Sequence, residues 1–304
     1  MRSLNDQLEG IAALDSTVLI TGETGTGKGW VARRIHDRSP RSGKPFIEVS
    51  CCGIEAPFLE STLFGYEDGG GAGTEGSGDG AFGSAQGGTI LLDGVGDLPL
   101  ELQPRLLKVL ERGTYRRMGG TRERPADVRI IAASKDGLEG LVRQGAFRED
   151  LYYRLNVLPL ELPPLRSRAP EDVAWLAGEI LADLRTTLGG GPETIDDDAL
   201  AVLTRHSWPG NIREMRNLLE RTLILAGDTD VIREDHLPAD LQAATERAEE
   251  NGEPMTLEEI ERLHVSRVLE QTEGNRSQAA RILGISRAAL YDKLDRYGLR
   301  KVGR

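Results

Sequence analysis

A glycine-rich turn near the amino terminus gives the clearest chemical signal in the sequence. The spacing G-x-x-x-x-G-K runs from Gly22 to Lys28, directly after the apolar run Val18–Ile20. Glycines in such a turn let backbone N–H groups face phosphate oxygens, while the lysine reaches the β- and γ-phosphates. The helical pattern that follows would present its N-terminus to the same anion. The turn therefore predicts nucleotide binding, and the alternative is an ordinary glycine-rich connection between strand and helix.

An acidic residue downstream supports the same prediction. The apolar run Thr89–Leu92 leads into Asp93, where P-loop proteins carry the acid that helps to hold Mg²⁺. The general pattern also places Ser or Thr after the lysine for this ion, whereas the chain has Gly29. The alternative for Asp93 is a strand-ending residue that caps the next turn. We expect ATP and Mg²⁺ as cofactors, with Asp93 as the metal ligand.

The C-terminal residues carry a second signal, which indicates a helix-turn-helix. In the stretch SQAARILG, the residues expected to be buried are Ala279, Ala280, Ile282 and Leu283. Gly284 and Ile285 would form the tight turn, and Ser286 would cap the following helix RAALYDKLDRYG. Leu290 and Leu294, which are four residues apart, are expected on the core side.

The polar face of this tail is predicted to contact DNA. Arg287 would read a base edge, most naturally of guanine, whereas Arg276 and Arg281 would contact phosphates. The complete set of expected contacts is Arg276, Arg281, Arg287, Ala288, Lys293 and Arg296. The preceding stretch TLEEIERLHVSRVLEQ has the apolar spacing of a dimer interface, so a two-fold symmetric site on double-stranded DNA is expected. Its apolar positions are Leu257, Ile260, Leu263 and Val268. The alternative is a helical hairpin that serves only in dimerisation.

The apolar pattern also predicts the scaffold that must position these residues. Short apolar runs at 18–20, 46–49, 89–92 and 128–131 resemble buried strands, and the amphipathic stretches between them suggest βαβ units and a parallel sheet. The following residues carry only helical patterns, and a polar, acidic stretch separates them from the tail. The predicted parts are an α/β nucleotide-binding part over 1–168, a helical part over 169–239, a linker over 240–255 and an all-α domain over 256–304.

Composition and charge exclude several classes of protein. The 304 residues contain no apolar run near the roughly 18 residues of a membrane span and no signal peptide, so no membrane partner is expected. Cys51 and Cys52 are adjacent and cannot form a disulfide framework, which indicates the cytoplasm. From Asn275 onward the net charge is +6, against −17 for the preceding residues. This asymmetry is typical of a local nucleic-acid contact on an acidic body.

The order of the motifs resembles the bacterial sigma-54-dependent enhancer-binding proteins. The matching words are VLITGETGTGKGWVARRIH, LESTLFGYE, GGTILLDGVGDLPLELQPRLLKVLE, FREDLYYRLNVLPLELPPLR, WPGNIREMRNLLERT and NRSQAARILGISRAALYDKLDRYGL. The resemblance covers nearly the whole chain. It implies an AAA+ P-loop parallel sheet with a helical lid and a Fis-type helix-turn-helix. It also implies a homo-oligomer, from dimer to hexamer, that hydrolyses ATP between subunits and remodels the sigma-54 RNA polymerase.

Carried over by position, the resemblance implies particular roles for individual residues. Arg213, in WPGNIRE, matches the sensor arginine of the lid. The implied nucleotide-binding set is Gly22, Glu23, Thr24, Gly25, Thr26, Gly27, Lys28, Gly29, Asp93 and Arg213. Arg148 and Arg154, in FREDLYYRL, match the catalytic arginines that a neighbouring subunit inserts toward the γ-phosphate. A planar guanidinium suits that task because it can hold phosphate oxygens in a bidentate way.

Three positions depart from the family pattern at the hydrolytic step. The residue after Asp93 should be the glutamate that polarises the attacking water, and here it is Gly94. Ser50 replaces the asparagine that pairs with that glutamate. Lys135 replaces the sensor asparagine and cannot accept a hydrogen bond from water. Loss of a positioned general base typically lowers a rate by about 10²–10⁴.

The loop expected to contact sigma-54 differs as well. The family reads Gly-Ala-Phe-Thr-Gly-Ala where this chain has Gly69–Thr74, within a stretch that holds seven glycines among residues 69–80. Such a loop has little apolar surface to bury and loses much entropy on ordering. We therefore predict a regulator that binds ATP and DNA, with impaired hydrolysis and impaired sigma-54 contact. The alternative is an active ATPase that remodels sigma-54 RNA polymerase to activate transcription.

Overall fold

The computed structural model divides the chain into two compact units, Met1–Pro238 and Ala239–Arg304. The residues that it describes are 2–67, 77–227, 229–238, 241, 261–262, 264–266, 268–269, 272 and 275–297. The predicted sigma-54-contacting residues Gly69–Thr74 lie outside this set, as does the predicted linker 240–255 apart from Leu241.

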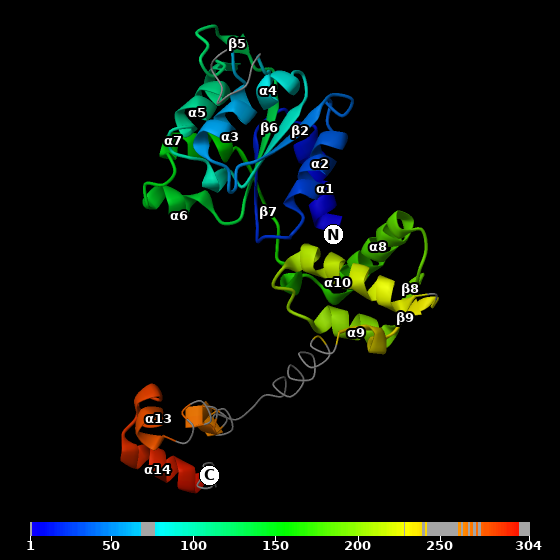
Figure 1. Cartoon of the computed structure of the whole chain (residues 1–304), viewed down its shortest axis with the longest axis vertical. Coiled ribbons are helices and arrows are strands. Elements are labelled where there is room, and N and C mark those ends of the chain that lie inside the picture. Colours follow the sequence, from blue (N-terminus) through cyan, green and yellow to red (C-terminus); the bar gives the residue numbers. More distant parts are fainter. Residues whose placement is uncertain are drawn as a thin grey trace. The chain divides into compact units, whose positions relative to one another are not determined.

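The first unit is built on a five-stranded sheet (Figure 1). Its strands are β1 (Val18–Thr21), β2 (Phe46–Ser50), β3 (Thr89–Asp93), β6 (Arg129–Ser134) and β7 (Leu158–Glu161). They lie in the order β2-β3-β6-β1-β7, and every neighbouring pair is parallel. The C-terminal ends of the strands therefore meet at one edge. The predicted α/β fold with a parallel sheet is confirmed.

Helices cover both faces of this sheet (Figure 1). One face packs against α1 (Arg2–Ala12) and α2 (Lys28–Asp37). The other packs against α3 (Ala56–Phe64), α4 (Gly80–Ser84), α5 (Gln103–Arg112) and α7 (Glu149–Leu155). Successive strand residues alternate between the two cores, because side chains along a strand point to opposite faces. Smaller elements on this unit are η1 (Val95–Asp97), β4 (Thr114–Tyr115), β5 (Arg124–Pro125) and α6 (Leu138–Arg143).

The apolar runs predict four of the five strands and miss β7. Its sequence LPLE is short and contains Pro159, which argues against a strand in the middle of a sheet. The strand lies at the edge, where proline is tolerated. The backbone N–H groups of Leu158 and Leu162 donate to the carbonyl oxygens of Thr17 and Thr21, at 3.2 and 2.8 Å. Proline therefore occupies a position that needs no donor.

The residues after β7 form a helical part, which we call the lid. Its elements are η2 (Leu165–Ser167), α8 (Pro170–Leu188), α9 (Asp197–Arg205), α10 (Asn211–Ala226) and η3 (Glu234–His236). The helical pattern predicted here is confirmed, and α8 buries Val173, Ile180, Leu181 and Leu184. Two strands of two residues each, β8 (Thr194–Ile195) and β9 (Val231–Ile232), pair in parallel. They are too short for a sequence pattern to reveal.

The second unit contains the predicted helix-turn-helix as α13 (Arg276–Ile282) and α14 (Arg287–Arg296). The Ser286 hydroxyl accepts a hydrogen bond from the Ala289 N–H at 3.1 Å, so the predicted N-cap is confirmed. Asn275 caps α13 in the same way, which the sequence reading missed. The prediction that Ile282 is buried is wrong, because 55% of it is exposed.

The core of this unit also changes one prediction about the dimer interface. Val268 is buried among Ala279, Ala280, Leu290 and Leu294, so it stabilises its own domain. The other predicted interface residues, Leu257, Ile260 and Leu263, lie outside the described residues. Among the helices that the structure describes, none is both long and apolar enough to cross a bilayer.

A buried histidine gives the first unit a predicted pH dependence. Nδ1 of His36 shares a hydrogen bond with Oγ1 of Thr89 at 2.9 Å, and burial lowers the pKa of His36 below its usual value of about 6.5. The unfolded chain therefore binds this proton more readily than the folded chain. The free energy of unfolding should fall as the pH decreases below about 6.5. Urea denaturation at a series of pH values should show this decline, and His36→Asn should reduce its slope.

The control for this experiment is His264→Asn, because His264 is exposed in the second unit. This substitution should leave the slope unchanged. An unchanged slope in His36→Asn would contradict the assignment of the pH dependence to that imidazole.

Candidate functional site

The predicted phosphate-binding turn joins β1 to α2. Gly22, Gly25 and Gly27 have φ angles of 151°, 83° and 96°, which residues with a β-carbon rarely adopt. A β-carbon on Gly22 would lie 2.7 Å from the carbonyl oxygen of Leu162. One on Gly25 would lie 2.2 Å from the carbonyl oxygen of Gly210. Backbone conformation and close approach both require glycine in this turn, which we call the phosphate loop.

The ammonium group of Lys28 lies inside the phosphate loop. Its Nζ donates to the carbonyl oxygens of Gly22 and Glu23, at 2.7 and 2.9 Å. Burial lowers the pKa of Lys28, while the charge of Asp93 raises it and that of Arg213 lowers it further. The charges of Asp93, at the end of β3, and of Arg213, in the lid, thus both act on the ammonium group of Lys28. The structure brings these three predicted residues together.

Asp93 is the last residue of β3, beside the phosphate loop. It lies opposite Ser50 of β2 and Ala133 of β6 in the sheet register. Within the described residues, no group of three or more His, Cys, Asp or Glu side chains could hold a metal ion by itself. One carboxylate is nevertheless enough for Mg²⁺ in a nucleotide site, because this ion keeps water and phosphate oxygens as its other ligands.

The remaining loop residues differ in their surroundings. The Thr26 side chain is buried, and its hydroxyl donates to the carbonyl oxygen of Glu23 at 2.8 Å, which holds the loop in shape. Thr24 is exposed. A β-carbon on Gly29 would lie 3.8 Å from Oε1 of Glu48, so this position has room for a side chain that the sequence lacks.

Several contacts from the lid reach the phosphate loop, and the sequence reading missed them. The Ile212 N–H donates to the carbonyl oxygen of Gly25 at 2.9 Å. Nη2 of Arg168 donates to the carbonyl oxygen of Thr26 at 3.3 Å. The N-terminus of α10 therefore lies against the loop, where a helix terminus favours an anion. The segment WPGNIRE contains the start of α10, but from the sequence we assigned a role only to its arginine, Arg213.

A cavity of about 570 Å³ opens next to the phosphate loop. Its lining includes Gly22, Glu23, Lys135, Asn156, Glu161 and Leu162. Apart from Asn156, which follows α7, these residues follow or end β1, β6 and β7. The cavity therefore lies at the C-terminal edge of the sheet, where ligands of open α/β sheets bind. Lys135 places a cation there instead of the asparagine that the family pattern predicts.

Gly94 follows Asp93 and has a φ angle of 74°. A β-carbon at this position would lie 2.1 Å from Sγ of Cys52. The Cys52 thiol donates to Oδ2 of Asp97 at 2.9 Å, and this carboxylate raises the pKa of Cys52 to about 11, so the thiol stays protonated at neutral pH. A thiol thus occupies the space that a side chain at position 94 would need.

The two arginines predicted to act on a neighbouring subunit lie on α7 and at its start. Arg148 holds Asp150 through Nε at 3.0 Å and Nη2 at 2.7 Å. Nε of Arg154 lies 3.8 Å from Oε1 of Glu111. Both side chains are about half exposed, and in this chain neither is among the groups that act on Lys28.

The predicted DNA contacts divide into two groups in the second unit. Those that are exposed are Arg281, Arg287, Ala288 and Arg296. Arg276 is half-buried, with its guanidinium 5.1 Å from the ring centre of Tyr291. Lys293 is ion-paired with Glu261, which also accepts a hydrogen bond from the Tyr297 hydroxyl at 2.6 Å. The exposed side chains lie on the surface of the unit, whereas Arg276 and Lys293 have the contacts just described.

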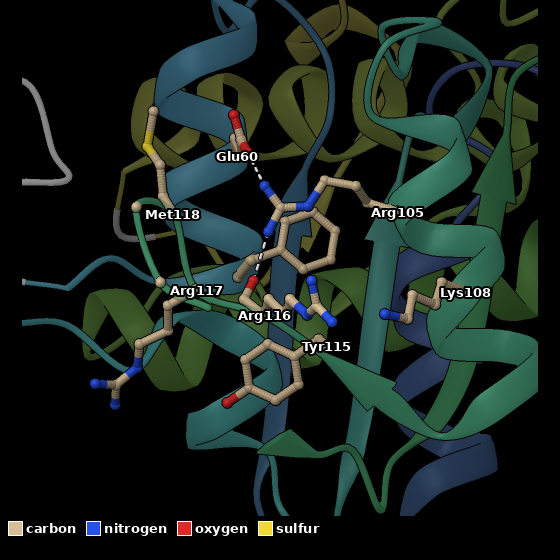
Figure 2. A pocket seen from close by; sticks show the side chains of 10 residues that line it. Glu60, Arg105, Lys108, Tyr115, Arg116, Arg117 and Met118 are labelled. Carbon is tan, nitrogen blue, oxygen red and sulfur yellow. Dashed lines mark hydrogen bonds and ion pairs between the residues drawn. The ribbon is translucent and has the colours of Figure 1, made fainter. Parts of the chain in front are cut away.

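A second cavity of about 350 Å³ lies between α3, α5 and the residues after β4. Figure 2 shows Arg105 pointing toward Glu60 and the backbone oxygen of Arg116, and Lys108 and the Arg116 side chain pointing toward each other, whereas Arg117 points away. Arg105 is ion-paired with Glu60 and stacks on Phe64, 4.3 Å from the ring centre. Lys108 and Arg116 both reach Oε1 of Glu123, at 2.6 and 3.0 Å. Arg105 and Lys108 of α5 thus connect this helix to α3 and to the hairpin formed by β4 and β5.

The same hairpin fixes the described residues on either side of the predicted sigma-54 loop. The N–H of Tyr66 donates to the carbonyl oxygen of Gly78, and the reverse bond has the same length of 3.0 Å. The Glu67 N–H donates to the carbonyl oxygen of Met118 at 3.1 Å. Arg117 is ion-paired with Asp79. The hairpin therefore anchors both ends of the stretch 68–76.

Models of three protein families match successive parts of the chain. The sigma-54 interaction domain matches residues 1–161, the AAA+ ATPase lid domain 166–254, and the Fis family of bacterial regulatory proteins 256–297. The chain belongs to the sigma-54-dependent transcriptional regulators. The resemblance inferred from the motifs is thereby confirmed, together with the AAA+ fold and the DNA-binding type of the tail.

Individual regulators of this family are similar along almost the whole chain. AtoC of Escherichia coli K12 is 43% identical over 95% of this chain and 64% of its own length. AlgB of Pseudomonas aeruginosa is 42% identical over 95% of this chain and 64% of its own length. The chain thus spans less than two thirds of the length of these relatives. The crystal structure of NtrX from Brucella abortus in complex with ADP has a TM-score of 0.72 and 36% identity, covering 98% of this chain and 68% of NtrX.

Position 94 yields a stability prediction for this sigma-54-dependent regulator. Gly94→Ala should lower the free energy of unfolding by about 1–2 kcal/mol, because a left-handed residue with a β-carbon costs about that much. The new methyl group must also displace the Cys52 thiol from Asp97. Cys52→Ala removes the contact but leaves the backbone cost, so the double variant should be more stable than the two single effects predict. Chemical denaturation measures all four chains.

Gly140→Ala is the matched control, because Gly140 lies in α6 with no atom within 4 Å of an added β-carbon. It should be neutral or stabilising, since alanine favours a helix over glycine. If Gly94→Ala proves as stable as the unmodified chain, the steric account of this position is wrong.

Proposed function

We propose that this chain is a DNA-binding transcriptional regulator whose AAA+ part binds ATP with Mg²⁺ but is impaired in hydrolysis and in sigma-54 contact. The observation that carries the proposal is the contrast between two neighbouring parts of one site. The phosphate loop and Asp93 provide the backbone, lysine and acid that a nucleotide needs, whereas Gly94 itself supplies no carboxylate.

Nucleotide binding is supported by the charges around the phosphate loop. Lys28 and Arg213 both place positive charge at the loop, and α10 adds the positive end of its helix dipole. Backbone N–H groups of the glycines would receive the phosphate oxygens. To reach a β- or γ-phosphate, Lys28 must leave the carbonyl oxygens of Gly22 and Glu23. NtrX, a relative of this chain, has been crystallised with ADP and with ATP.

Asp93 is the residue that would hold Mg²⁺ in this site. Bound Mg²⁺ offsets the charge of the β- and γ-phosphate oxygens. Asp93 would act directly or through water, because Gly29 offers no hydroxyl for the ion. The charge of Asp93 raises the pKa of Lys28, which supports a position of Asp93 close to the phosphates.

Impaired hydrolysis is supported by three residues around the end of β3. Gly94 has no group to take a proton from water, and Ser50, opposite Asp93 in the sheet, cannot reproduce an asparagine amide. Lys135 lines the cavity next to the loop and can only donate hydrogen bonds. Asp97 is the nearest other carboxylate to Gly94, but it accepts a hydrogen bond from Cys52. This arrangement can neutralise phosphate charge but lacks a free base.

Weak sigma-54 contact is supported by the composition of residues 69–74, which carry no aromatic side chain. Assembly is supported by Arg148 and Arg154, whose half-exposed side chains could reach a neighbouring subunit. Arg148 would first have to leave Asp150. We propose a homo-oligomer between dimer and hexamer in which these two arginines approach the γ-phosphate bound to the next chain.

DNA binding is assigned to the tail, where α14 would enter the major groove of a two-fold symmetric site. Ser286 caps the helix, so Arg287 stands in its first turn with its side chain exposed. Arg281 and Arg296 are also exposed and suit phosphate contacts. Lys293 would have to leave Glu261 to contact DNA.

The ATPase prediction can be tested with the full chain. Equilibrium titration with a fluorescent ATP analogue in the presence of Mg²⁺ should show binding that Lys28→Ala weakens by about tenfold or more, a loss of roughly 1.4 kcal/mol. Steady-state ATP turnover, measured over a series of protein concentrations, should equal that of Lys28→Ala. The reason is that position 94 supplies no base to activate water.

Arg112→Ala is the control, because Arg112 is exposed at the end of α5. This variant should bind the analogue as the unmodified chain does. Turnover that exceeds the Lys28→Ala value and rises cooperatively with concentration would establish the active ATPase instead. Absence of nucleotide binding would refute the binding half of the proposal.

The DNA prediction separates base reading from phosphate contact. After selection of the preferred site from random DNA, Arg287→Ala should lose about 1–3 kcal/mol of discrimination at one base pair in each half-site. Arg281→Ala should weaken all sequences equally and reduce the slope of log affinity against log salt by about 1. Fluorescence anisotropy at several salt concentrations measures both quantities. Equal loss on all sequences in Arg287→Ala would contradict its role in base reading.

A further inference from the structure

The side chain of Glu23 bonds to the lid, although Glu23 itself belongs to the phosphate loop. Its Oε1 accepts a hydrogen bond from Nη2 of Arg166 at 2.5 Å, and its Oε2 accepts one from Nη1 at 2.8 Å. Nδ2 of Asn211 also donates to Oε2, at 3.1 Å. Glu23 is therefore held as a carboxylate by a bidentate guanidinium and an amide, an arrangement that fixes direction as well as distance.

Asn211 is the central residue of this set. It is fully buried, and its φ angle is 52°, in the left-handed region that asparagine tolerates better than most residues. Its Nδ2 donates to the carbonyl oxygen of Thr24 at 3.1 Å as well as to Glu23. Its Oδ1 accepts a hydrogen bond from the N–H of Leu165 at 2.7 Å. One buried amide thus joins the phosphate loop to two parts of the lid.

The three side chains connect segments that are far apart in the sequence. Arg166 lies in η2, where the chain passes from β7 into the lid, and Asn211 is the first residue of α10. Arg213 follows Asn211 by two residues on the same helix, so its position depends on where the start of α10 is held. An ionised Glu23 without Arg166 would, by contrast, be a negative charge next to the predicted phosphate site that has lost its ion-pair partner.

We propose that Glu23, Arg166 and Asn211 form a clasp that positions the lid over the phosphate loop and so sets the affinity for nucleotide phosphates. The side chain of Glu23 is in this account a positioning group that does not contact nucleotide, although the backbone of Glu23 belongs to the phosphate loop, and Arg166 cancels its charge. The inference rests on the proposed binding of ATP, and its test is chosen so that the two can fail separately.

If Arg166 cancels the charge of Glu23, variants of these two residues should differ in nucleotide affinity in a characteristic order. Arg166→Ala leaves an ionised Glu23 that repels phosphate, so the Kd for a fluorescent ADP analogue should rise by about tenfold or more, within the range usual for coupled sites. Glu23→Gln keeps an amide oxygen for Arg166 and removes the charge, so its effect should be smaller. The double variant Glu23→Gln/Arg166→Ala should bind more tightly than Arg166→Ala alone. A purely structural role would make the double variant the weakest.

A second ion pair in the lid provides the matched control. Nη1 of Arg216 lies 2.7 Å from Oδ2 of Asp183, which joins α10 to α8 without touching the phosphate loop. The side chains are 42% and 61% exposed, compared with 47% and 38% for Arg166 and Glu23. Arg216→Ala should therefore change the Kd by less than about twofold, as expected for a remote surface pair.

The experiment is an equilibrium titration of the full chain and these variants with the fluorescent ADP analogue, at constant salt and pH. Thermal unfolding without nucleotide identifies any variant that fails to fold, and Arg166→Lys then replaces Arg166→Ala, because it keeps the charge but loses the bidentate bond. The clasp would be refuted if Arg166→Ala bound the analogue as tightly as the unmodified chain does. It would also be refuted if the double variant bound no more tightly than Arg166→Ala. Either result would leave the proposal of nucleotide binding intact. An unmodified chain that binds no nucleotide would overturn both.

Discussion

The structure depends on the close approach of three backbone segments at the phosphate loop, which only glycine permits. The carbonyl oxygens of Leu162 and Gly210 would lie only 2.7 and 2.2 Å from β-carbons added to Gly22 and Gly25. The residue after β7 and the turn before α10 can therefore both press against the loop. This contact allows the Ile212 N–H to bond to Gly25 and brings Arg213 close enough to lower the pKa of Lys28. A methyl group at either glycine would move the lid and every charge that it carries.

Binding and hydrolysis occupy different parts of this arrangement. The groups that would hold phosphate come from the loop and from α10, whereas the groups that would activate water belong to the ends of β2, β3 and β6. The second set has changed in this chain without disturbing the first, because β3 keeps its register with both neighbours up to Asp93. A regulator can then retain a nucleotide as part of its fold after turnover has been lost, since bound ligand stabilises the folded state whether or not it reacts.

The sequence predicts those parts that depend on local pattern. Four buried strands, the phosphate loop and the Ser286 cap are visible because apolar runs, glycine spacing and capping residues act over a few positions. The clasp could not be predicted, because Glu23 and Asn211 are 188 residues apart and only the folded chain brings them together. Strand β7 escaped notice because its proline contradicts the usual pattern. Ile282 was placed in the core because a helical period fits it, but the short α13 buries only its alanines.

The thiol beside Gly94 also bears on the history of the site. A side chain can enter position 94 at low cost only after Cys52 has become smaller or has turned away, since the sulfur lies 2.1 Å from the β-carbon that would be added. A carboxylate next to Asp93 is therefore easier to accommodate once position 52 carries a smaller residue. The residue at position 52 thus influences which side chains position 94 can accept.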